Sequence, residues 1–223
     1  MDLNQALNIP LQKGGNVTLH NLHQQGLEKP KAPAGSDLVN LKNMGYEGEF
    51  YFGNPTQKMQ VIFDTGSPAA WVYSDKCKAN NCPVQNKKYE QGKSSEFHNN
   101  DHAGQIIQYG RGTVLGHPST DRLCFTQGED HCVHNISFLT VVKAADLSAL
   151  KGSGLVGLAP SPASKKNLDD PFHAGVPGFV SQLKANKDFN KDFEPMFSIY
   201  LSNDESVPGK MIFGGYDLAQ FAK

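Results

Sequence analysis

Apolar and polar residues alternate with a period of two over several short stretches of the chain from Leu38 onward. Such alternation is typical of strands with one buried face. One stretch, 177–185, has helical spacing instead, with a proline near its start. The predicted strands are 46–52, 59–63, 69–73, 105–109, 113–115, 136–142, 155–158, 197–201 and 210–213. Turn residues between neighbouring strands predict three hairpins. The pattern therefore predicts an all-β fold, as stacked sheets or a barrel, with one or two short helices.

The first 37 residues have a different pattern. They contain three prolines, two adjacent glycines and a short amphipathic stretch at 16–25. We interpret 1–37 as a leader segment and 38–223 as one lobe. A flexible N-terminal tail is the alternative interpretation of the same composition.

Composition and charge exclude some classes of function. The chain has 223 residues, and its hydrophobic share of 38% and charged share of 19% are those of a globular protein. The net charge is −1, and only two of the 21 basic residues are arginine, so we expect no nucleic-acid partner. No run of about 18 apolar residues occurs, so the sequence predicts no membrane-spanning helix.

The four cysteines form two close pairs in the sequence, Cys77/Cys82 and Cys124/Cys132. Of the three possible pairings, the short spacings favour the local one. Two N-glycosylation sequons, at Asn16 and Asn135, add to the indication of an oxidising compartment. We therefore expect a secreted protein or one of the lysosomal or vacuolar lumen. The first residues have no signal-peptide pattern, so either a signal peptide was removed or the protein is not secreted.

Metal binding is an alternative use of the second cysteine pair. Two histidines flank Cys132, but its spacing from Cys124 does not match common zinc patterns, and a hairpin disulfide fits better. His98 and His102 lie four residues apart without the glutamate of a zinc hydrolase. We expect no metal and no cofactor.

The residues with the clearest chemical potential are Asp64-Thr65-Gly66-Ser67, at the end of an apolar strand. The carboxylate enters a tight turn in which Gly66 tolerates unusual backbone angles, and the neighbouring hydroxyls can hydrogen-bond its charged form. Such a carboxylate can act as an acid or a base. For an isolated Asp-Thr-Gly, however, a turn that merely closes a hairpin is the better interpretation.

The surrounding segments favour catalysis, because from about Leu38 to the C-terminus the chain resembles the pepsin-like aspartic proteases. The resemblance rests on six segments in the order of that family: 46–57, 64–72, 77–82, 109–112, 154–159 and 197–217. It implies the N-terminal lobe of that family, a double-psi-type β-barrel with stacked sheets. The leader is similar to the start of the family's inhibitory prosegment, which implies a zymogen.

The resemblance also implies a role for individual residues. In this family two aspartates share a proton and activate a water molecule, and Asp64 would be the first of them. Ser67 would hold Asp64 by a hydrogen bond, with Thr65 and Gly66 completing the supporting loop. Trp71 would pack against a tyrosine of the flap, the hairpin that closes over the substrate. The implied flap and substrate-binding residues are Tyr109, Gly110, Arg111, Gly112, Ile62 and Leu155.

Some positions depart from the family pattern. Gly152 stands where a bulky apolar residue is common and would widen a subsite, and Arg111 at the flap tip would favour acidic substrate side chains. No second Asp-Thr-Gly or Asp-Ser-Gly occurs up to Lys223. We therefore expect this chain to supply only the first catalytic aspartate and the flap, and to need a second lobe or a second copy for a complete site. The expected partner is a peptide or protein substrate. The alternatives are an inactive relative that binds a peptide or protein, and a lobe that is active only as a dimer.

Overall fold

The computed structural model describes residues 34–40, 46–78, 82–83, 86–100, 103–128, 131–147, 150–160, 176–186, 193–202 and 207–217. The amphipathic stretch at 16–25 and the sequon at Asn16 lie outside these residues.

The described part of the chain is mostly β-strand, which confirms the predicted fold class. The strands are β1 (Ala34–Asn40), β2 (Tyr46–Phe52), β3 (Gln57–Asp64), β4 (Ala70–Tyr73), β5 (His98–Asn99), β6 (Gln105–Gln108), β7 (Thr113–Cys124), β8 (Cys132–Ala145), β9 (Gly154–Gly157), β10 (Phe197–Tyr200) and β11 (Gly209–Phe213). A short 3-10 helix covers Gln91–Lys93, and the α-helix α2 covers Phe179–Ala185.

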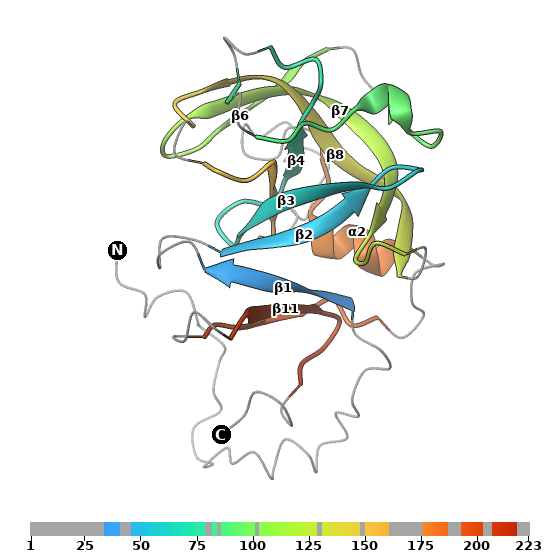
Figure 1. Cartoon of the computed structure of the whole chain (residues 1–223), viewed down its shortest axis with the longest axis vertical. Coiled ribbons are helices and arrows are strands. Elements are labelled where there is room, and N and C mark those ends of the chain that lie inside the picture. Colours follow the sequence, from blue (N-terminus) through green and yellow to red (C-terminus); the bar gives the residue numbers. More distant parts are fainter. Residues whose placement is uncertain are drawn as a thin grey trace.

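The strands follow one another in a single hydrogen-bonded order, β10-β11-β1-β2-β3-β9-β4-β8-β7-β5, and β6 pairs with β7. An additional pairing of β2 with β7 closes the strands β2, β3, β9, β4, β8 and β7 into a ring, which makes the lobe barrel-like. In Figure 1, β1 and β11 form a layer beneath β2 and β3, while β7 and β8 arch over the opposite side. The predicted hairpins are present as β2–β3, β6–β7 and β10–β11.

The two faces of the barrel wall carry separate hydrophobic clusters. The larger cluster contains the inward-facing phenylalanines of β2 and β11 and the buried face of α2. The smaller cluster surrounds Trp71 on β4 and includes Ile107, Leu155 and the disulfide-bonded Cys77 and Cys82. It lies next to the flap hairpin, so its packing positions the candidate site.

Several boundaries differ from the predictions. Strands β7 and β8 extend well beyond the predicted 113–115 and 136–142, and they pair with each other along most of their length. Helix α2 begins at Phe179 rather than at 177, because Gly178, with a non-helical ψ of 138°, is the N-cap. Strand β1 was not predicted, and it continues across the proposed leader boundary at residue 37 while pairing with both β11 and β2.

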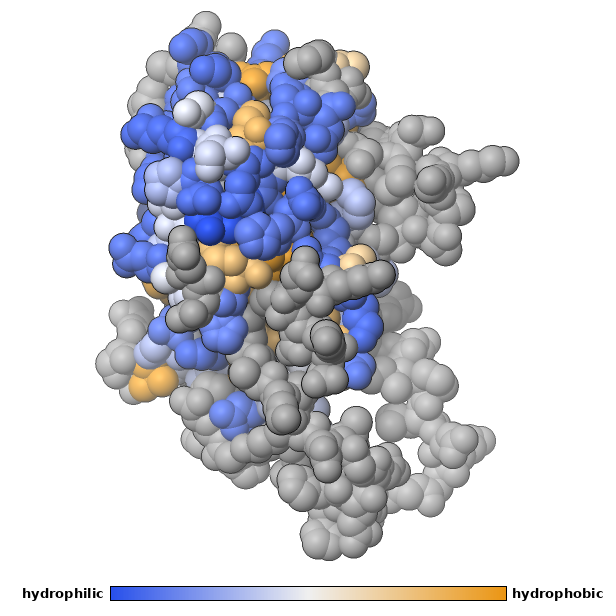
Figure 2. Space-filling model, turned by 90° about the vertical axis from the view of Figure 1, so that its right-hand side faces the viewer, coloured by the Kyte–Doolittle hydropathy of each residue, from blue (hydrophilic) through white to orange (hydrophobic). Residues whose placement is uncertain are grey.

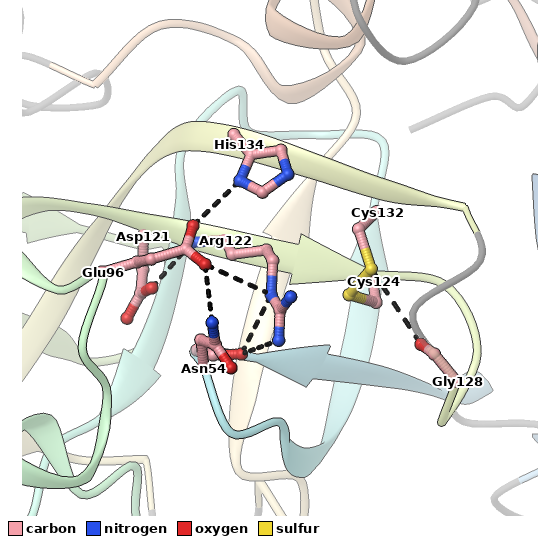
Figure 3. The surroundings of a disulfide bond; sticks show 9 residues. Asn54, Glu96, Asp121, Arg122, Cys124, Gly128, Cys132 and His134 are labelled. Atoms are coloured by element: carbon pink, nitrogen blue, oxygen red, sulfur yellow. Dashed lines mark hydrogen bonds and ion pairs between the residues drawn. A yellow bond between two sulfur atoms is a disulfide. The ribbon is translucent and has the colours of Figure 1, made fainter.

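Both cysteine pairs form disulfides, Cys77–Cys82 and Cys124–Cys132. The second links the ends of β7 and β8 (Figure 3). Its sulfurs are therefore not zinc ligands. Two disulfides in a chain of this size fit an oxidising environment.

The face in Figure 2 is mainly hydrophilic, with small hydrophobic areas. Within the described residues, no helix is both long enough and apolar enough to cross a lipid bilayer.

Candidate active site

Asp64 is the last residue of β3, where the strand leaves the sheet beside the parallel strand β9. Each oxygen of its carboxylate accepts a hydrogen bond from its own loop. The Gly66 amide donates to Oδ1 at 2.8 Å, and the Ser67 hydroxyl donates to Oδ2 at 2.5 Å. Ser67 is only 2% exposed, whereas Thr65 and Gly66 are exposed. The loop thus fixes the orientation of the carboxylate, while Asp64 itself stays partly exposed to solvent.

The loop itself is held by the end of β9 and the two residues that follow it. The Leu158 amide donates to the Asp64 carbonyl at 2.7 Å, and the Ala159 amide donates to the Ser67 carbonyl at 3.1 Å. Gly157 is needed at this crossing, because a Cβ there would overlap the Ser67 carbonyl oxygen. Segments 64–69 and 157–159, about ninety residues apart, therefore form one backbone unit.

The flap is the hairpin of β6 and β7 with its tip at residues 109–112. The Tyr109 amide donates to the Gly112 carbonyl at 2.9 Å, and Gly112 has a positive φ of 88° that favours glycine. The Trp71 indole Nε1 donates to the Tyr109 hydroxyl at 2.7 Å. Burial raises the pKa of the Tyr109 hydroxyl, and hydrogen bonding to Trp71 offsets this only in part, so the hydroxyl stays neutral.

The sequence-predicted residues fall into two groups. Asp64 is hydrogen-bonded to Gly66 and Ser67, Trp71 is hydrogen-bonded to Tyr109, and an interaction of the Tyr109 hydroxyl with Ser67 links the two sets. Ile62, two residues before Asp64, pairs with Leu155. Gly110 and Arg111 are exposed at the flap tip. The two disulfides and Asn135 do not contact Asp64. No group of three or more His, Cys, Asp or Glu side chains in the described segments could hold a metal ion.

Sequence reasoning did not single out Glu47, which lies on β2 opposite Ile62. Its side chain is on the face of the sheet away from the core phenylalanines, yet the residue is only 6% exposed. Its buried Oε1 has no hydrogen-bond partner among the described residues. Desolvation raises the pKa of the Glu47 carboxyl, and the positive charge of Lys151 offsets this only in part. A strand pattern alone could not reveal this, because Glu47 occupies a position that alternation assigns to solvent.

We expect Glu47 to make folding less favourable at neutral pH. A carboxyl whose pKa is raised by folding contributes stability at acidic pH, and that contribution is lost as the pH rises through the folded-state pKa. The free energy of unfolding, measured by urea denaturation, should therefore fall less between acidic and neutral pH in Glu47→Gln than in the parent. Glu49→Gln is the matched control, since Glu49 is more exposed and paired with Lys58 at 2.6 Å. Equal pH dependence in Glu47→Gln and the parent would contradict the prediction.

Comparison with known proteins agrees with this geometry. The family model described as eukaryotic aspartyl protease matches residues 45–223. The chain belongs to the eukaryotic aspartyl protease family. It is 33% identical to aspartic proteinase A1 of Arabidopsis thaliana over 193 residues, which cover 83% of this chain and 35% of that protein. It is 34% identical to phytepsin of Hordeum vulgare over 185 residues (81% and 33%), and 29% identical to cathepsin E-B of Xenopus laevis over 226 residues (96% and 52%).

The chain thus spans between about a third and a half of the length of these relatives. The segments of this aspartyl protease that were expected to form a site are all inside the matched range. What the complete relatives do as whole proteins is therefore considered as a proposal for this chain.

Proposed function

We propose that this chain supplies one catalytic carboxylate, Asp64, and the flap of an aspartic endopeptidase. The observation that carries the proposal is the double hydrogen bonding of Asp64 by Gly66 and Ser67 beneath a hairpin whose Tyr109 is tied to Trp71. This arrangement holds one carboxylate in a fixed orientation and leaves it partly exposed to solvent. It suits a carboxylate that shares a proton with a second one and removes a proton from a bound water molecule.

The peptide substrate would lie between Asp64 and the flap. Ile62 and Leu155 offer an apolar wall beside the carboxylate, and Leu155 packs in the same cluster as Trp71. The exposed backbone at the flap tip can hydrogen-bond an extended peptide. Hydrolysis then requires no cofactor, because the attacking water is activated by the carboxylates alone.

The second carboxylate would come from a second lobe, since no other Asp-Thr-Gly or Asp-Ser-Gly follows Ser67 in this sequence. Two features support a docking place for such a lobe. Strand β10 is at the edge of the sheet and exposes Ile199, with Met196 and Leu201 exposed at its ends. An open groove of about 440 Å³ reaches from Phe197 and Met196 to Thr65 in the catalytic loop. A lobe covering this surface would meet Asp64 from the open side.

The disulfides indicate the compartment in which we propose that the protein acts. Two disulfides fit a secreted protein or one of the lysosomal or vacuolar lumen. An acidic lumen would also suit a carboxylate pair that must hold one proton.

Lobe complementation tests the proposal. The chain would be incubated with denatured globin at acidic pH, alone and after co-refolding with the C-terminal lobe of a pepsin-like protease, with a statine-type inhibitor as control. We expect inhibitor-sensitive cleavage only when the second lobe is present. Cleavage by the chain alone, eluting as a dimer, would show that a second copy completes the site. A complex that forms but never cleaves would favour a peptide-binding lobe without catalysis.

A further inference from the structure

Strand β8 contains an irregularity at the predicted sequon. The register of β7 and β8 shifts between Asp121, which faces Ile136, and Leu123, which faces Val133. Two residues of β8, His134 and Asn135, therefore lie opposite the single residue 122 of β7. This is a β-bulge, and Asn135 has the left-handed backbone conformation, with φ of 55°.

The bulge decides which side chains reach solvent. In a regular strand, neighbouring side chains point to opposite faces. Here His134 and Asn135 are both exposed, whereas Ile136 is 1% exposed and belongs to the main core. The extra residue thus turns Asn135 outward and still delivers Ile136 to the core.

The backbone around the sequon is fixed from several sides. The side chain of Gln182 on α2 accepts a hydrogen bond from the Ser137 amide at 2.6 Å and donates one to the Ser137 carbonyl at 2.9 Å. The Asn186 amide group donates to the His134 carbonyl at 2.8 Å. Glu96, which also accepts a hydrogen bond from Asn54, contacts His134 Nδ1 at 2.8 Å (Figure 3). Asn135 is therefore presented on a rigid frame next to the Cys124–Cys132 disulfide.

We propose that Asn135 carries an N-linked glycan. The sequon Asn135-Ile136-Ser137 is the acceptor pattern, and the bulge places its asparagine in solvent. In the transfer, Asn135 Nδ2 forms a bond to the anomeric carbon of an oligosaccharide carried on a lipid diphosphate. The bond from that carbon to the phosphate oxygen breaks, the lipid diphosphate leaves with the electron pair, and the amide gives up one proton.

The position of Asn135 leaves the cleft open. The flap end of β8 is Ala145, which pairs with Thr113. Asn135 lies ten positions before it, or roughly 33 Å along the strand at about 3.3 Å per residue. A glycan at Asn135 would cover the side of α2 that carries Gln182 and Asn186, whereas Val180 and Ser181, which line the groove toward Thr65, lie on the other side of that helix. The proposal rests on passage through the secretory pathway, not on catalysis, so it can fail independently of the proposed function.

The test is expression of the chain behind a secretion signal in eukaryotic cells. Peptide N-glycosidase should increase the electrophoretic mobility of the parent, and Asn135→Gln and Ser137→Ala should each lose one glycosylated band. Ser137→Thr keeps the sequon and should keep that band. Asn99→Gln is the matched control, an exposed strand asparagine outside any sequon, and should change nothing. Asn16→Gln separates the contribution of the other sequon.

Mass spectrometry of the secreted parent decides the result even if a variant folds poorly. A tryptic peptide in which Asn135 becomes aspartate only after peptide N-glycosidase treatment is the expected outcome. Secreted, disulfide-bonded parent whose Asn135 peptide is unmodified would overturn the proposal.

Discussion

Replacing Asp64 with asparagine, in the chain assembled with its second lobe, is expected to lower kcat by about 10³-fold, the range for losing a general base. Asparagine has nearly the same shape. Its carbonyl oxygen at the Oδ1 position can still accept the hydrogen bond from the Gly66 amide, and its NH2 group at the Oδ2 position can donate to the Ser67 hydroxyl, which then becomes the acceptor. Its amide cannot take a proton from water at any working pH. The loss should therefore fall on kcat, with a much smaller change in KM.

Two variants make this result specific. Asp37→Asn removes an exposed carboxylate that pairs with Lys210 at 2.7 Å and should leave kcat unchanged. Ser67→Ala removes the hydrogen bond to Oδ2 of Asp64 and should lower kcat about tenfold. The reason is that a hydrogen bond to a charged group contributes about 1.5 kcal/mol or more. Activity would be measured with a quenched-fluorescence peptide, and folding by the emission of the single tryptophan, Trp71. Statine-sensitive cleavage by Asp64→Asn at the parent rate would refute the assignment of Asp64.

The parts of this lobe that sequence predicts well are those in which neighbouring residues determine the structure. The hairpin of β2 and β3 is such a case, because both strands alternate and the turn 53–56 joins them directly. The loop 64–67 is another, since its hydrogen bonds run between residues two and three positions apart. The disulfides follow the same rule, because each closes a short loop.

The remaining features depend on contacts that are distant in sequence. The residues around β9 do not indicate that this strand is inserted between β3 and β4. Likewise, the spacing of residues does not indicate the hydrogen bond between Trp71 and Tyr109, which are thirty-eight positions apart. The extent of β7 was underestimated because Gly116 and Pro118 look like strand breakers, yet both pair with β8. In β8, the bulge at residues 134–135 interrupts the alternation, and residues 138–141 are buried on both faces, so a period of two marked only its middle.

The largest expected effect on stability comes from Phe50, whose alternation on β2 was predictable but whose partners were not. Its side chain is fully buried, and its ring lies 5.1–6.1 Å from those of Phe63, Phe125, Phe179 and Phe213. These partners come from β3, the residue after β7, α2 and β11, so one ring connects four parts of the lobe.

Phe50→Ala should lower the free energy of unfolding by about 3–5 kcal/mol, as expected when an aromatic side chain leaves a cavity that its neighbours cannot fill. Phe50→Leu retains most of the volume and should cost clearly less, while Tyr51→Ala, on the opposite face of the same strand, should cost least. Urea denaturation followed by Trp71 emission measures all three, and Trp71 belongs to the other cluster, so its signal reports on global unfolding. A cost for Phe50→Ala no greater than that for Tyr51→Ala would show that the four segments are held together by β-pairing alone. Among the described residues, β11 joins the barrel through β1, and β1 pairs with β2 only at Val39 and Asn40. We therefore expect the aromatic cluster to fix that layer, and with it the edge strand β10 on which the second lobe is proposed to dock.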